Sequence, residues 1–83
     1  MSAATDAFLD MLSAARGAAA NTLAAYRRDL EGAEEILGDL SKVERAKVAK
    51  LAREWADLAP STVVRKASAL RQFFGFALDE GWR

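Results

Sequence analysis

Hydrophobic residues recur every three or four positions along most of this chain, which is the spacing of one face of an α-helix. The clearest such segment runs from Ala59 to Arg83. Pro60 suits a first helical position, and Ser61 or Thr62 can cap the free N–H groups of the first turn. Gly81 can end the helix in the left-handed conformation. The pattern therefore predicts one long C-terminal helix.

The two sides of this predicted helix differ in chemistry. Its apolar side is expected to face the core and carries Val63, Ala67, Leu70, Phe74 and Ala77. The opposite side carries Ser61, Arg65, Ser68, Gln72 and Gly75. No acidic residue lies between Leu58 and Leu78, whereas Arg65, Lys66 and Arg71 are basic. Such a helix can lie against a phosphate backbone, although an ordinary solvated basic face gives the same pattern.

Three more helices are predicted upstream. The first runs from about Thr5, its expected N-cap, to Arg16 and stops at Gly17. Its core-facing residues are Phe8, Leu9 and Leu12, with Met11 beside them. Asn21 is expected to cap the second helix, which covers about Thr22 to Leu37. The core face of this helix is predicted to carry Leu23, Tyr26, Leu30, Ala33 and Leu37.

The third helix is predicted from a capping-box pattern, Ser41 followed three residues later by Glu44, and runs to about Asp57. Its buried stripe is predicted to carry Val48, Leu51, Ala52, Trp55 and Leu58. An alanine-rich composition, a single proline and no alternating pattern favour an all-α fold. Short connections indicate a compact four-helix bundle, with residues 1–83 forming one domain.

The composition excludes several kinds of chemistry. The chain has no cysteine and no histidine, so thiolate sites, His-based triads and zinc sites are not expected, and no metal or other cofactor is predicted. Tyr26 is interpreted as a ring in the core. The acidic pairs Glu34-Glu35 and Asp79-Glu80 are interpreted as surface charges. The small core leaves no room for a large internal pocket, so neither enzymatic activity nor a small-molecule substrate is expected.

The location expected for this chain is cytoplasmic. No apolar run approaches the length needed to cross a membrane. The start of the sequence, MSAATDAFLD, carries acid where a signal peptide would carry base. No membrane partner is therefore predicted.

Formal net charge is zero, from 12 basic and 12 acidic residues, but the charges are unevenly placed. Two predicted helix starts combine polar caps with basic residues: Asn21-Thr22 with Arg27 and Arg28, and Ser61-Thr62 with Arg65 and Lys66. A helix N-terminus offers free N–H groups and a positive dipole end to a phosphate oxygen, and neighbouring arginines can fix a duplex backbone. Ordinary capping would explain either site alone. Two such sites on one small domain favour local, modest binding to DNA.

Two segments carry a family resemblance. NTLAAYRRDL, from Asn21 to Leu30, and STVVRKASALRQFFGFALDEGW, from Ser61 to Trp82, resemble tyrosine recombinases. The match is to the core-binding, SAM-like N-terminal domain of the Xer and phage-integrase group, whose members commonly show N-T-x-x-x-Y-x-x-D-L followed by a Ser-Thr-x-x-Arg helix. The resemblance covers about Ala4 to Arg83. Ala67 stands where the family usually has leucine, which is expected to thin the core.

The resemblance implies a four-helix domain that forms one half of a clamp around double-stranded DNA. Its second and fourth helices would enter the major groove beside the strand-exchange site, to support DNA integration or recombination. Together with the helix-start argument, it gives these predicted DNA-binding residues: Asn21, Thr22, Ala25, Arg27, Arg28, Ser61, Thr62, Arg65, Lys66, Ser68 and Arg71. Of these, Arg27, Lys66 and Arg71 lie towards the flanks of their helices.

Outer surfaces, including the first helix, would contact other recombinase protomers in a tetramer. The family's catalytic residues belong to a second domain that this chain does not contain, and Tyr26 matches a structural tyrosine rather than the nucleophile. The alternative is a small helical protein-interaction module that does not bind DNA. In that case the aromatic residues Phe73, Phe76 and Trp82, taken as exposed, would matter more than the arginines.

Overall fold

The computed structural model describes residues 2–83, which form four helices and no strand. They are α1 (Ala3–Arg16), α2 (Ala20–Leu37), α3 (Arg45–Glu54) and α4 (Pro60–Asp79). The all-α, four-helix prediction is confirmed for these residues. Met1, where the predicted domain begins, lies outside the described residues. None of the described helices is long and apolar enough to span a membrane.

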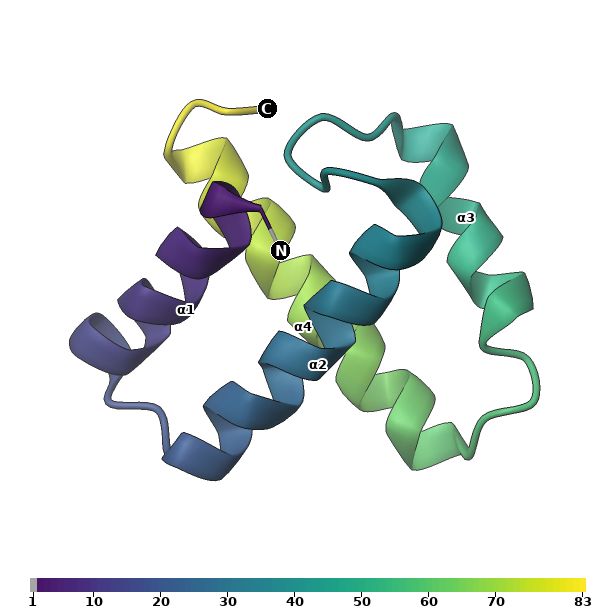
Figure 1. Cartoon of the computed structure of the whole chain (residues 1–83), viewed down its shortest axis with the longest axis horizontal. Coiled ribbons are helices and arrows are strands. Elements are labelled where there is room, and N and C mark those ends of the chain that lie inside the picture. The colour runs from purple at the N-terminus through teal and green to yellow at the C-terminus, as the bar shows by residue number, and fades with distance from the viewer. Residues whose placement is uncertain (1) are drawn as a thin grey trace.

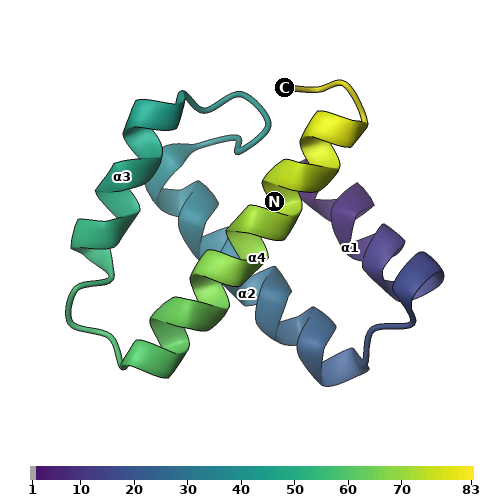
Figure 2. The same ribbon diagram turned by 180° about the vertical axis from the view of Figure 1, so that it is seen from behind.

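The arrangement is organised around a crossing of α2 and α4 (Figure 1). Helix α1 packs against both of them, and α3 lies on the other side, where it packs against α2. The N-terminal ends of α2 and α4 both lie along the lower edge of the molecule in Figures 1 and 2, at opposite corners of that edge. These are the two helix starts that the sequence singled out.

Two of the predicted helix stops are confirmed. Gly17 and Gly81 both adopt positive φ angles, 61° and 78°, which favour glycine. At the end of α4 the Trp82 N–H donates to the Ala77 carbonyl (2.9 Å) and the Gly81 N–H to the Leu78 carbonyl (3.1 Å). This pair of bonds satisfies carbonyls that the helix end would otherwise leave unpaired.

The predicted N-cap residues are wrong for all four helices. Ser2, not Thr5, is the N-cap of α1, and its side chain accepts from the Thr5 N–H. Thr5 instead lies inside the helix, where its hydroxyl donates to the Ser2 carbonyl (2.8 Å) and to Glu34 Oε1 (3.3 Å). Asn21 lies inside α2, because the helix begins one residue earlier, after Ala19. A good capping residue therefore marked the neighbourhood of a helix start but not its position.

The N-caps of α3 and α4 also differ from the prediction, for identifiable reasons. Ser41 does not form a capping box, because its N–H and hydroxyl both donate to Asp39 Oδ1 (2.9 and 2.7 Å) in a local turn. Helix α3 consequently begins after Glu44, and it ends at Glu54 rather than Asp57. In α4, Pro60 occupies the first turn as predicted, and the extended residue before it, Ala59, is the N-cap. Ser61 and Thr62 therefore lie inside the helix and do not cap it.

The core is contiguous and draws on all four helices. Its buried hydrophobic residues are Phe8, Leu9, Leu12, Leu30, Ala33, Leu40, Val43, Leu51, Ala69, Leu70, Phe73 and Ala77. The rings of Phe8 and Phe73 meet edge to face, with centroids 5.7 Å apart, and join α1 to α4. The predicted core face of α1 is confirmed. In α2, Leu30 and Ala33 are fully buried, while Leu23, Tyr26 and Leu37 are half-buried.

The buried side of α4 is rotated relative to the prediction. Ala69 and Phe73 are completely buried, whereas Ala67 is exposed and Val63 and Phe74 are half-buried. The reason is that α4 packs against α1 and α2, while the α3 backbone approaches only α2 within the described residues. Ala67 instead lines an open apolar groove between α3 and α4. For the same reason, Ala52 and Leu58 are exposed rather than part of a buried stripe.

Glu34 ties three segments together and is not a plain surface charge. Its Oε1 accepts from the Ser2 N–H (3.1 Å) and from the Thr5 hydroxyl (3.3 Å), and its Oε2 accepts from the Leu40 N–H (3.0 Å). The carboxylate thus joins the start of α1, the end of α2 and the loop that follows. Its neighbour Glu35 is exposed, as predicted.

Candidate nucleic-acid interface

A buried ion-pair network lies where α2 crosses α4. Only 1% of the Asp29 side chain is exposed. Arg65 binds the Asp29 carboxylate side-on, with Nε donating to Oδ2 and Nη2 donating to Oδ1, both at 2.9 Å. Lys66 Nζ donates to Oδ1 as well, at 3.1 Å. One carboxylate of α2 therefore holds two consecutive cations of α4.

The charge state of Asp29 follows from these contacts. Burial alone would raise the pKa of this carboxyl, because it removes water from the charged form. Hydrogen bonds from Arg65 and Lys66, together with their positive charges, outweigh burial, and the net pKa lies below the usual 3.8. The carboxylate in turn raises the pKa of the Arg65 guanidinium. Asp29 and Arg65 are therefore both charged at neutral pH.

The two cations differ in their access to solvent. The Arg65 side chain remains 42% exposed, whereas that of Lys66 is only 18% exposed. The Lys66 ammonium also lies 5.8 Å from the centre of the Trp55 ring, within the range of a cation–π contact. Arg65 therefore faces outwards from the network, and Lys66 is its inner member.

A second polar contact joins α2 to α4 further along the crossing. Gln72 Nε2 donates to the Tyr26 hydroxyl and to the Ser68 hydroxyl oxygen, both at 3.1 Å. Arg16 Nη1 from α1 donates to Gln72 Oε1 at 3.4 Å. Tyr26 is half-buried with its hydroxyl engaged in this network, which agrees with its interpretation as a structural ring.

The starts of α2 and α4 lack side-chain caps, because alanines occupy both N-cap positions. Their first-turn N–H groups can thus meet an external acceptor, and the dipoles of both helices place positive charge at these starts. Around these starts the predicted residues are largely accessible. Those that are exposed are Asn21, Thr22, Arg27, Arg28, Ser61, Arg65 and Arg71. Those that are half-buried are Ala25, Thr62, Lys66 and Ser68.

The structure separates the flank residues from the rest. Arg27 Nη1 lies 3.5 Å from Asp6 Oδ1, so this arginine points towards α1. Arg71 lines a groove between α3 and α4. Arg65, by contrast, pairs with Asp29 on α2. The three arginines therefore have different neighbours: Asp6 of α1, Asp29 of α2 and the groove beside α3.

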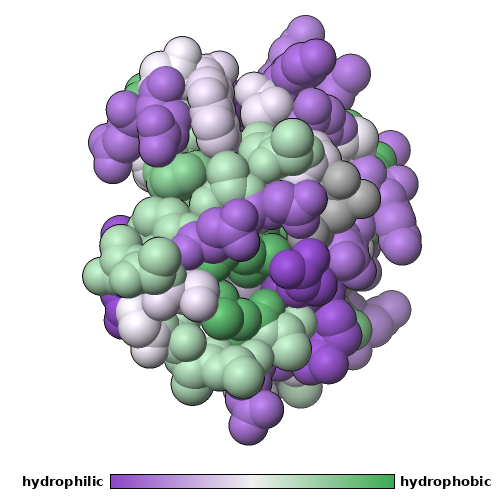
Figure 3. Space-filling view, turned by 60° about the vertical axis from the view of Figure 1, so that its left-hand side comes forward, coloured by the Kyte–Doolittle hydropathy of each residue, from purple (hydrophilic) through white to green (hydrophobic). Residues whose placement is uncertain are grey.

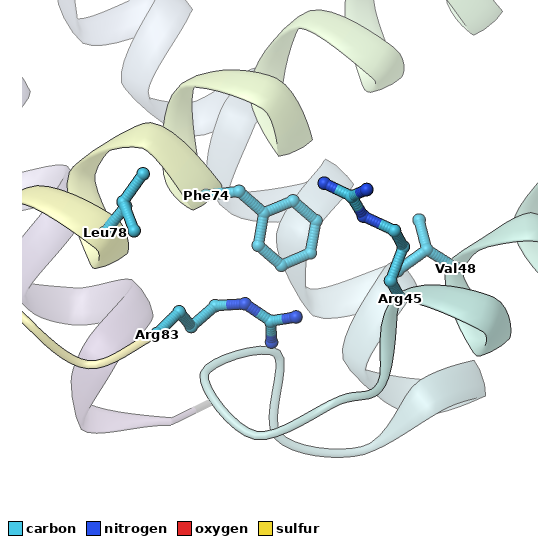
Figure 4. Close-up of a pocket in the computed structure, with 5 residues that line it drawn as sticks. All are labelled: Arg45, Val48, Phe74, Leu78 and Arg83. Carbon is cyan, nitrogen blue, oxygen red and sulfur yellow. The ribbon is translucent and has the colours of Figure 1, made fainter.

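The groove between α3 and α4 is open and mainly apolar. Val48, Trp55, Val63 and Phe74 are among the residues that line it. It continues into a pocket of about 470 Å³ next to the chain end, where Arg45 and Arg83 flank the Phe74 ring (Figure 4). The Arg83 guanidinium lies 4.9 Å from the centre of that ring, and its Nη1 donates to the Leu40 carbonyl (3.0 Å). No acidic residue is among those that line these two hollows.

Sequence reasoning missed Asp29, the centre of the network. A signal was present, since Asp29 lies three residues after Tyr26 and four before Ala33, both on the predicted core face. An acid at such a position requires a cationic partner. Phe73 was also misjudged, because it is fully buried and is not an exposed aromatic residue.

The fold and the exposed residues define a small four-helix domain with two uncapped, basic helix starts along one edge. The family described as "Phage integrase, N-terminal SAM-like domain" matches residues 5–81. The chain therefore belongs to this family, which confirms the assignment expected from its two motifs.

The similar proteins are Xer tyrosine recombinases. "Tyrosine recombinase XerC" of Erythrobacter litoralis is 66% identical over 82 residues, which cover 99% of this chain and 27% of the relative. "Tyrosine recombinase XerD" of Brucella abortus is 46% identical over 88 residues, covering 99% and 28%. The XerD of Caulobacter vibrioides is 42% identical over 84 residues, covering 94% and 28%. This chain thus spans little more than a quarter of these relatives' length. No solved structure matches it.

Proposed function

We propose that this chain is the DNA-contacting, non-catalytic arm of a site-specific tyrosine recombinase. It would bind the major groove and the phosphates of double-stranded DNA beside the strand-exchange site. The observation that carries this proposal is the pair of uncapped helix starts along one edge of the molecule, each with an exposed arginine on the following turns. Family membership supports it, because the relatives are named as tyrosine recombinases.

The predicted DNA-binding residues take different roles in this proposal. Asn21, Thr22, Ser61 and Thr62 would hold phosphate oxygens together with the free N–H groups of the helix starts. Ala25 and Ser68 are small and would let the helices approach the groove closely. Arg28 and Arg65 would reach phosphates or guanine edges. Arg27, Lys66 and Arg71 would add positive charge from the flanks.

Strand cleavage and exchange would belong to a further domain of the full-length protein, and the protein would act in the cytoplasm. Other protomers would assemble with this arm, and the outer side of α1 is the surface proposed for that contact. Figure 3 shows the side on which α1 comes forward, with weakly hydrophobic, pale green surface next to hydrophilic side chains. The exposed alanines Ala3, Ala14 and Ala15 of α1 are consistent with a surface that another helix can approach.

The DNA proposal is tested by fluorescence anisotropy with a labelled duplex of about 20 base pairs, roughly two helical turns. Binding by this chain is expected to be weak, with Kd on the order of 10⁻⁴ to 10⁻⁶ M, and to weaken as salt rises. Arg28→Gln should reduce both the affinity and the salt dependence.

Arg53→Gln is the matched control, because Arg53 is also an exposed arginine and lies in the last turn of α3. It removes the same charge from a different helix. Equal effects of the two substitutions would mean that only net charge matters. That result, or a lack of binding at low salt, would contradict a DNA interface on α2 and α4.

The second candidate function is a protein-interaction module, favoured by the apolar groove between α3 and α4. Its arginine rim and lack of acidic lining residues suit an amphipathic helix that carries acidic residues. Trp82 is 43% exposed and Phe76 half-buried, so these aromatic residues remain available to it. Self-association in sedimentation experiments would support this function. Arginine variants of α2 and α4 that fold normally and lose DNA binding would contradict it.

A further inference from the structure

The geometry points to Asp29 as a positioning residue for sequence recognition: it fixes the Arg65 guanidinium so that the outer edge of that group presents two parallel N–H donors to a guanine base. This inference rests on the proposed function, since it requires the α4 start to meet the major groove. It goes further by assigning a role to a buried residue that would never touch DNA, and by naming the base that is read.

The Asp29–Arg65 ion pair leaves the outer edge of the guanidinium free. Arg65 uses Nε and Nη2 to hold the two oxygens of Asp29, each at 2.9 Å. One N–H of Nη2 and both of Nη1 remain, and they make no hydrogen bond within residues 2–83. The remaining N–H of Nη2 and one N–H of Nη1 form the outer edge of the planar group. Such an edge matches the O6 and N7 acceptors of guanine in the major groove.

The Asp29 carboxylate that holds Arg65 is itself fixed in position. Asp29 is buried and is held in turn by Lys66 at 3.1 Å, so its carboxylate cannot turn away from Arg65 without leaving that ammonium unpaired. An arginine side chain normally loses rotamer freedom when it binds a base. Here part of that freedom is already lost in the folded protein, which favours binding in one orientation.

The competing explanation is that the network only fastens α2 to α4 and neutralises Arg65. Both explanations predict that Asp29 matters for stability. They differ in base preference, because a fastening role leaves no reason for one guanine to be selected. They also differ in the response of the Arg65 side chain to DNA.

The first test uses nitrogen-15 NMR of the arginine side chains of this 83-residue chain. The duplex of about 20 base pairs is added at low salt, with a guanine at every second or third position of one strand. We expect the Nη signals of Arg65 to shift while its Nε–H signal stays in place, because the hydrogen bond from Nε to Asp29 is retained when DNA binds. Movement of the Nε–H signal to the position of a free arginine would overturn the inference. So would unchanged Nη signals.

The second test measures base preference by selecting duplexes from a randomised pool with three proteins. The wild type should enrich one guanine by about 5- to 150-fold, the discrimination expected from a bidentate pair. Arg65→Lys keeps the positive charge but lacks two parallel N–H donors, so the enrichment of that guanine should fall close to one-fold. Arg53→Lys, on α3 and outside the proposed interface, is the matched control and should leave that guanine enriched.

Asp29→Asn completes the design, with folding checked first by its amide spectrum. Removing a negative charge should leave overall DNA affinity equal or higher, while the guanine preference falls. Preserved preference in folded Asp29→Asn, or no guanine preference in the wild type, would overturn the inference. If amides near Thr22 and Ser61 still respond to DNA in that case, the proposed function stands without it. If no signal responds, both fail.

Discussion

Replacing Asp29 with alanine should destabilise this domain strongly, even though the residue lies at a helix crossing rather than among apolar core residues. The substitution removes three charge-assisted hydrogen bonds of 2.9, 2.9 and 3.1 Å from a side chain that is 1% exposed. It also leaves the Lys66 ammonium, 18% exposed, without its carboxylate. Removing one partner of a buried pair costs more than the pair itself contributes, because a charge remains buried and unpaired.

The expected loss is about 2 to 4 kcal/mol, towards the lower end of values for buried pairs because Arg65 can be rehydrated. A domain of this size has a total stability of about 4 to 12 kcal/mol. The midpoint of thermal unfolding should therefore fall by roughly 10 to 25 °C. Circular dichroism during heating and urea titration would measure the change. A loss below about 0.5 kcal/mol would refute the reasoning, since that is the range of ordinary surface substitutions.

The same network predicts a pH dependence. The pKa of Asp29 is lower in the folded chain than its usual 3.8, so the unfolded state binds the proton more readily. The contribution to stability is complete above that usual value and is lost as pH falls through the folded pKa. The stability difference between the wild type and Asp29→Asn should therefore shrink as pH is lowered from 6 towards 2. A difference that stays constant over that range would contradict this assignment.

Three further substitutions test other parts of the fold. Glu34→Ala should cost about 1 to 3 kcal/mol, because the backbone N–H groups of Ser2 and Leu40 lose their acceptor. Glu35→Ala, at the exposed neighbour, should change stability by less than about 0.5 kcal/mol, and similar effects of the two substitutions in urea titration would contradict the role given to Glu34. Phe73→Ala should cost about 3 to 5 kcal/mol in the same assay, and a loss near 1 kcal/mol would mean that the ring is not in the core. Ala19→Ser should raise the stability by about 1 kcal/mol by capping α2, and no rise in the melting temperature would argue against an uncapped start.

The sequence pattern was sufficient for the class of fold and for the positions of the four helices. Helical spacing located α1 and its core face, and glycine chemistry located the stops at Gly17 and Gly81. The starts were misplaced because Ser, Thr and Asn side chains have several possible local partners, and the choice depends on contacts such as that of Thr5 with Glu34. Such contacts join residues far apart in the chain and leave no local pattern.

The orientation of α4 shows the same limit for the site. Its sequence allows several neighbouring apolar faces, and packing against α1 and α2 selects the one that contains Ala69 and Phe73. That rotation turns Lys66 towards Asp29 and leaves Arg65 at the surface. The motifs therefore identified the basic residues of the candidate interface, but only the packing distinguished the outward cation from the inward one.

The most direct test of the DNA-contacting role is an amide NMR titration of this chain with the duplex of about 20 base pairs, at low and at moderate salt. It tolerates weak binding and reports on each residue separately. The account predicts shifts that cluster at Thr22 to Arg28 and at Ser61 to Ser68 and that fade as salt rises. Shifts confined to the groove between α3 and α4, or an unchanged spectrum at millimolar duplex, would contradict it.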